Sequence, residues 1–135
     1  MNIRTFSGIL LTESLLFAVR FLLGMAVNLF ITIPNPVIGS FFESVRGILV
    51  IVHIINGLVI VTLAIVIIFL TRKLKSILPL QLSTLALAFI ILAIASGVTF
   101  LLFGQVDAYS YTMAIGFAFA VVLYSFVGKA AMQVN

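Results

Sequence analysis

The chain has 135 residues, of which 64% are hydrophobic and 7% charged, with seven basic and three acidic side chains. A soluble domain is typically about 45–50% apolar and about 25% charged, so this composition excludes a soluble surface and predicts an all-α integral membrane protein. Cysteine is absent, which excludes a disulfide framework, a thiolate metal site and a cysteine nucleophile.

Four apolar runs are long enough to cross a bilayer, since a membrane-spanning helix needs about 20 residues. The predicted spans cover residues 9–33, 47–70, 80–103 and 108–128. They predict a four-helix antiparallel bundle in one transmembrane domain over residues 1–135. The first run carries Arg20 near its centre and is followed by no small-residue cleavage site, so we predict a retained helix rather than a signal peptide.

The connection after the first span contains a helix start, the Asn-Pro pair at 35–36, because asparagine caps helices and proline suits the first helical position. Apolar residues then recur at helical spacing, and we predict a short amphipathic helix over 36–46 that lies in the membrane interface. Gly47 is expected to allow a bend into the second span. At the last connection, Asp107 or Ser110 is expected to cap the fourth helix.

Basic residues predict the orientation, because cytoplasmic loops are enriched in Lys and Arg. One side of the predicted bundle carries only Arg46. The other side carries Arg4, Arg72, Lys73, Lys75 and Lys129. We therefore predict a multi-pass protein of the cell membrane with both termini in the cytoplasm. Since these charges lie just outside apolar runs, they indicate contact with lipid headgroups and no nucleic-acid partner.

Polar residues form a stripe on the first span, where Glu13, Arg20, Gly24 and Asn28 lie within one arc of the helical wheel. Such a stripe faces other helices or a water-filled space rather than lipid. The other spans place small and polar residues at similar depths, which predicts a polar cavity in the outer leaflet. The predicted polar cluster of the membrane core comprises Glu13, Arg20, Asn28, His53, Asn56, Ser96 and Thr112.

These residues have structural as well as functional interpretations. Arg20 can lean toward the start of its helix and pair with Glu13, about 10 Å away, or it can bind a ligand. Asn28 can join helices through hydrogen bonds. His53 is the only histidine. It can be a neutral imidazole bonded to Asn28 or Thr112, a metal or haem ligand, or a proton relay.

The segment HIINGLVIVTLAIVIIF resembles the histidine-bearing helix of four-helix membrane haem bundles, such as one half of haem A synthase and small b-type cytochromes. The resemblance implies haem b with His53 as an axial ligand and with Gly57, one turn on, leaving room for the porphyrin. Those bundles usually supply two axial histidines, and this chain has one. Met113, or His53 of a second copy, would complete the pair, and Arg46 would contact a propionate.

Two further resemblances concern other parts of the chain. FLLGM-x-x-NLF followed by proline resembles short, uncharacterised four-span membrane proteins of bacteria and archaea, and this resemblance implies no activity. Glu13 in ILLTESLLF is similar to the glutamate in the first span of small multidrug transporters, although their membrane tryptophan and glycine-rich motif are absent here.

Enzyme motifs are missing from the sequence, which has no glycine-rich phosphate loop, no paired carboxylates and no Ser-His-Asp arrangement. The leading hypothesis is a non-enzymatic polytopic membrane protein, either an accessory or a ligand-binding component, with a polar outer-leaflet cavity that could bind a hydrophobic ligand. The alternatives are a haem b-binding electron-transfer protein and a small ion- or proton-coupled transporter. The expected partners are the lipid bilayer and either a second copy of the chain or a larger membrane complex, and no metal site is predicted.

Overall fold

The computed structural model describes residues 3–34, 39–103 and 105–133. Within these residues the chain forms long α-helices and one short 3-10 helix, and no strand. In chain order the elements are α1 (Ile3–Phe30), the 3-10 helix η1 (Gly39–Glu43), α2 (Val45–Thr71), α3 (Leu78–Leu102) and α4 (Asp107–Met132). This confirms the predicted all-helical bundle.

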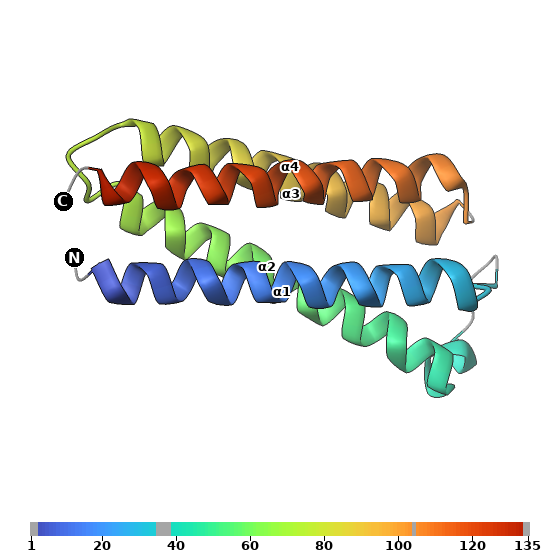
Figure 1. The fold of residues 1–135 in the computed structure, drawn as a ribbon. Coiled ribbons are helices and arrows are strands. Elements are labelled where there is room, and N and C mark those ends of the chain that lie inside the picture. The colour runs from blue at the N-terminus through green and yellow to red at the C-terminus, as the bar shows by residue number, and fades with distance from the viewer. Residues whose placement is uncertain (1–2, 35–38, 104, 134–135) are drawn as a thin grey trace.

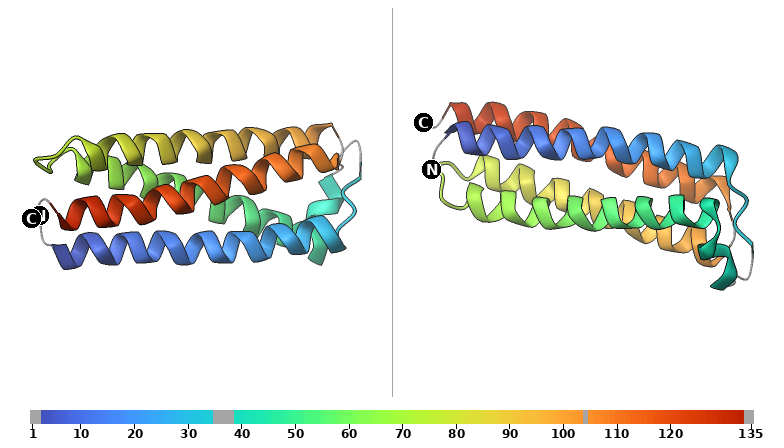
Figure 2. Two further views of the ribbon diagram at one scale, coloured as in Figure 1. Left: turned by 45° about the horizontal axis from the view of Figure 1, so that its top comes forward. Right: turned by 90° about the horizontal axis from the view of Figure 1, so that it is seen from below.

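The four long helices of the described chain form a two-layered antiparallel bundle. Each packs beside its neighbours in the chain, and α1 also packs beside α4 (Figure 1). Seen from below, α1 and α4 form one layer and α2 and α3 the other (Figure 2, right). Both ends of the described chain and the α2–α3 connection lie at one end, called here the terminal end, while η1 and the α3–α4 connection lie at the other, the η1 end. The first half of α2 diverges from α3 and α4 toward the η1 end (Figure 1).

Each long helix is long and apolar enough to cross a membrane. In the most apolar part of each helix, 22–28% of the residues are buried inside the bundle, and the others are partly or fully exposed. The outward side chains include exposed Leu22, Leu58, Ile91 and Val122. Helices that are apolar on all sides fit a lipid environment, and these four suggest a multi-pass membrane protein.

The connection between α1 and α2 differs from the predicted amphipathic helix over 36–46. Its expected start at 35–36 lies outside the described residues. The short helix observed is a 3-10 helix, and Val45 and Arg46 already belong to α2. The helical spacing of apolar residues thus continues across the boundary between η1 and α2. The spacing alone does not reveal this boundary.

Ser44 makes this break and begins α2. Its hydroxyl accepts a hydrogen bond from the Gly47 N–H at 3.1 Å and donates one to the Phe41 carbonyl at 2.6 Å, as expected for a serine at the N-cap. A Cβ at Gly47 would lie 2.2 Å from the Phe41 carbonyl oxygen. The bend predicted at Gly47 is therefore at Ser44, and Gly47 instead lets η1 pack against the first turn of α2.

The fourth helix begins without the predicted side-chain cap. Val106 is at the N-cap position and makes no side-chain capping bond. Asp107 is the first residue of α4, and Ser110 lies inside the helix. The α1 helix begins earlier than the predicted span over 9–33 and also ends earlier, at Phe30. Hydropathy identifies the residues that fit lipid rather than the ends of the hydrogen-bonded helix.

Small residues hold α3 and α4 together, the most closely packed pair of helices. A Cβ at Gly116 would lie 2.9 Å from the Phe89 carbonyl oxygen and 3.1 Å from the Ala93 Cβ. Ala86 and Ala120 are fully buried. Small residues allow helix backbones to approach closely in membranes, where apolar burial alone supplies little attraction.

The buried apolar side chains form two separate clusters. The cluster toward the terminal end comprises Phe6, Phe17, Ile60, Ala64, Ile67, Ala86, Ile90, Ala120, Tyr124, Val127 and Ala131. The cluster toward the η1 end comprises Val27, Ile31, Ile33, Val50 and Phe100. The two clusters are separated at the level of residues 20–24 of α1 and 53–57 of α2, where Arg20 and His53 lie.

Gln105 ties the two connections together at the η1 end. Its amide nitrogen donates to the Ile31 carbonyl at 2.7 Å, and its amide oxygen accepts from the Ile33 N–H at 3.0 Å. Both backbone groups lie in the connection after α1, so the Gln105 side chain satisfies polar groups that have no partner in a helix. This role of Gln105 was not predicted from the sequence.

Candidate functional site

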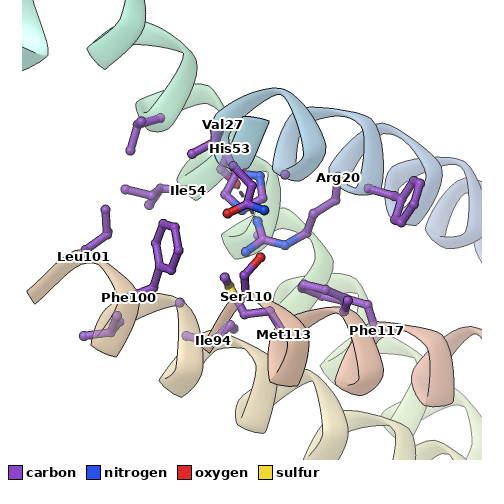
Figure 3. A pocket seen from close by; sticks show the side chains of 18 of the residues that line it. Arg20, Val27, His53, Ile54, Ile94, Phe100, Leu101, Ser110, Met113 and Phe117 are labelled. Atoms are coloured by element: carbon purple, nitrogen blue, oxygen red, sulfur yellow. Dashed lines mark hydrogen bonds between the residues drawn. The ribbon is translucent and has the colours of Figure 1, made fainter. Parts of the chain in front are cut away.

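A cavity of about 230 Å³ lies between the two apolar clusters, and all four long helices line it (Figure 3). Most of its lining side chains are apolar. The polar side chains among them are Arg20, Asn28, His53 and Ser110. The cavity thus has a polar region, which Arg20 and His53 dominate, in mainly apolar surroundings.

Arg20 crosses from α1 to α2 instead of following its own helix (Figure 3). The side chain is 6% exposed, and its Nη1 donates a hydrogen bond to the His53 carbonyl oxygen at 2.5 Å. The guanidinium carbon lies 4.8 Å from the centroid of the Phe117 ring, close enough for a cation–π contact. Neither carboxylate oxygen of Glu13 has a hydrogen-bond partner in the described part of the chain, so the predicted direct pair of Arg20 with Glu13 is not formed.

Three glycines make room for the side chains of the cavity. A Cβ at Gly57 would lie 2.4 Å from Arg20 Nη1 and 2.8 Å from its Cζ. A Cβ at Gly24 would lie 3.3 Å from His53 Cε1, and one at Gly97 would lie 3.0 Å from the Met113 sulfur. Because Gly57 has no side chain, the guanidinium of Arg20 fits beside its backbone. This explains why Arg20 points toward α2.

His53 lies on α2 above the Arg20 guanidinium (Figure 3), and its Nδ1 is buried with no hydrogen-bond partner among the described residues. The Thr112 hydroxyl donates to the Ala108 carbonyl of its own helix at 2.8 Å. Asn28 lines the same cavity, but it makes no bond to Nδ1. Among the described residues no hydrogen bond joins the His53 imidazole to Asn28 or Thr112, so the predicted bond between them is not formed.

The remaining predicted site residues lie outside the cavity lining. Glu13 is fully buried, and Asn56 has a buried amide oxygen without a partner among residues 3–34, 39–103 and 105–133. The Ser96 hydroxyl donates to the Leu92 carbonyl of its own helix at 3.0 Å. Arg46 is exposed at the start of α2. Of the predicted site residues, the structure brings together Arg20, Asn28, His53 and Met113.

Ser110 and Phe117 are cavity residues that were not predicted from the sequence. They flank Met113 on α4, and their side chains reach the same space as the Arg20 guanidinium (Figure 3). Spacings of three and four residues place all three on one face of a helix. That spacing was available in the sequence, but Ser110 lies in a segment that also has the composition of a turn.

The residues that the haem resemblance implies do not fit a porphyrin in this arrangement. The space at Gly57 holds the Arg20 guanidinium. Arg46, the expected partner of a propionate, does not line the cavity, although His53 and Met113 do. In the described part of the chain, no group of three or more His, Cys, Asp or Glu side chains could hold a metal ion.

No family model, no curated protein and no solved structure gives a significant match to this chain. Its function is therefore inferred from the residues that form the cavity.

Proposed function

We propose that this chain is a non-enzymatic multi-pass protein of the cell membrane whose cavity binds a small hydrophobic molecule taken from the bilayer. The observation that carries this proposal is the cavity of about 230 Å³ between the two apolar clusters. An apolar cavity of about 150 Å³ in a soluble protein is already large enough to bind benzene. The present cavity is larger, so a small apolar group or part of a chain fits inside it.

The flank of the bundle supplies a route into the cavity. Phe21, Ile54, Leu58 and Val98 line the cavity and are also exposed. These residues lie within the spans of α1, α2 and α3, so the cavity lining reaches the outer side of the bundle. In a bilayer this side faces the acyl chains, so a hydrophobic molecule can enter without crossing water.

The lining favours binding over catalysis. It offers one guanidinium, one amide, one hydroxyl and one imidazole, and no carboxylate. General acid–base catalysis requires a positioned donor and acceptor of protons, usually with a second group that orients them. The Ser110 hydroxyl and the unpartnered His53 Nδ1 form no such hydrogen-bonded pair.

The arrangement of charges supports an orientation with both termini in the cytoplasm and the cavity in the outer leaflet. The terminal end of the bundle holds the α2–α3 connection and the end of α4 (Figure 1). These segments carry Arg72, Lys73, Lys75 and Lys129. Loops rich in Lys and Arg remain on the cytoplasmic side.

Photolabelling of the reconstituted protein tests the binding proposal. An uncharged alkanol that carries a photoreactive diazirine should label cavity residues such as Met25 and Met113, and excess unlabelled alkanol should suppress this labelling. Ala114→Phe, which fills the cavity lining, should abolish the saturable labelling. Ala118→Phe is the matched control, because Ala118 is exposed one turn further along α4 and does not line the cavity. Labelling spread evenly over all four helices, without saturation, would contradict the proposal.

A further inference from the structure

Arg20 carries a charge that no acidic side chain neutralises. The chain has three acidic residues. Glu13 has no hydrogen-bond partner for either oxygen in the described part of the chain. Glu43 and Asp107 are exposed at the η1 end. None of the three lines the cavity, so the guanidinium is a buried cation without a carboxylate beside it.

The guanidinium also has unused hydrogen-bond donors. An arginine side chain has five N–H donors, and here Nη1 bonds the His53 carbonyl. Nε is buried without a partner among the described residues. The Phe117 ring stabilises the positive charge through a cation–π contact. It does not replace an oxygen as a hydrogen-bond acceptor for the N–H groups. A buried polar donor without an acceptor destabilises the protein, so this group is suited to an incoming oxygen.

The surroundings of the guanidinium define the rest of the ligand. Beyond the polar side chains of Arg20, Asn28, His53 and Ser110, the cavity is lined by apolar side chains such as Val27, Val50 and Phe100. A free inorganic anion would leave this apolar lining without contacts. A molecule with an anionic group at one end and an apolar chain at the other matches both parts of the cavity.

We propose that the ligand is an amphiphile with a single anionic headgroup, a carboxylate or a phosphate, that accepts hydrogen bonds from Arg20 while its apolar chain lies in the cavity. This inference rests on the proposed function and specifies its ligand. The planar guanidinium donates pairs of parallel hydrogen bonds that match the oxygens of carboxylate and phosphate. Asn28 and Ser110 supply further polar groups near the headgroup.

Binding measured on the full chain in nanodiscs of zwitterionic lipid tests this inference, with empty discs subtracted. The probes are dodecanoate, dodecyl phosphate, dodecanol and inorganic phosphate, measured by equilibrium dialysis. Dodecanoate or dodecyl phosphate, or both, should bind about 10- to 100-fold more tightly than dodecanol, which has the same tail, because hydrogen bonds to charged groups are the stronger ones. Inorganic phosphate should not bind measurably. Preference for one headgroup over the other identifies whether the natural ligand carries a carboxylate or a phosphate.

Arginine variants assign the preference to one side chain. Arg20→Gln should reduce the ratio of anionic to neutral binding to that of empty discs, and Arg20→Lys should retain part of it, because lysine keeps the charge but not the planar fork. Arg46→Gln is the matched control, since Arg46 is an exposed arginine outside the cavity lining. It should leave the ratio unchanged.

The outcomes separate this inference from the proposed function. Equal binding of dodecanol and the anionic probes to the unsubstituted protein would overturn the inference and leave the proposed function standing. If inorganic phosphate bound as tightly as dodecyl phosphate, the proposal that the ligand has an apolar chain would be overturned. Failure of all four probes to bind would overturn both proposals. The comparison of probes needs no variant, so it decides the question even where Arg20→Gln does not fold.

Discussion

Replacing Glu13 by methionine should stabilise the protein. Glu13 is fully buried, and both of its carboxylate oxygens lack a hydrogen-bond partner among the described residues. A buried polar group left without a partner costs about 1–3 kcal/mol, and more when it is charged. Methionine has a similar length and an apolar, flexible side chain that fills irregular spaces. Glu13→Met should therefore raise the free energy of unfolding by about 1–3 kcal/mol.

The measurement is reversible unfolding of the ligand-free protein in mixed micelles. Glu13→Gln keeps the shape and a polar end that also lacks partners, so its effect should be smaller than that of Glu13→Met. Glu43→Met is the matched control, because Glu43 is exposed in η1 and its replacement should change stability little. A loss of more than about 1 kcal/mol in Glu13→Met, the loss typical of a broken hydrogen bond, would refute the reasoning. It would mean that Glu13 has a partner in the folded protein.

Three further predictions concern packing and topology. Gly116→Ala should lower the free energy of unfolding by about 1–3 kcal/mol because its Cβ overpacks the α3–α4 contact, whereas Gly8→Ala should raise it by about 0.5–1 kcal/mol, since Gly8 lies in a helix with open space around it. Equal effects in the two variants, measured by the same unfolding assay, would contradict the packing argument. Gln105→Ala should cost about 1–3 kcal/mol in that assay, because two partly buried backbone groups lose their partner; no change would mean that water replaces it. Since the chain has no cysteine, an impermeant maleimide applied to intact cells should label Asp107→Cys and not Lys73→Cys, and the reverse pattern would invert the orientation.

The apolar runs predicted the four helices because a stretch of about 20 apolar residues has few stable alternatives to a membrane-spanning helix. The polar stripe on α1 also contains two residues that line the cavity, Arg20 and Asn28. These features depend on one helix at a time. They are therefore accessible from the sequence.

The direction in which the Arg20 side chain points could not be predicted from the sequence of α1 alone. A helical wheel places Glu13 on the same face and predicts a pair within α1. The structure instead offers a carbonyl and a gap at Gly57 on α2, and both depend on how α2 is aligned with α1. The same limit applies to His53, whose neighbours follow from helix packing. Loop contacts such as those of Gln105 are likewise decided by tertiary structure.

The position of the Arg20 partner on a later helix has a consequence for biogenesis. During synthesis α1 leaves the ribosome first, and its central arginine then has neither the His53 carbonyl nor the gap at Gly57 to receive it. An arginine at the centre of an inserting helix costs about 2.5–3.5 kcal/mol at the translocon. We therefore expect α1 to remain at the translocon until α2 arrives and to be released into lipid together with it. We expect the compact α3–α4 hairpin, with its small-residue contact, to insert afterwards as a unit of its own.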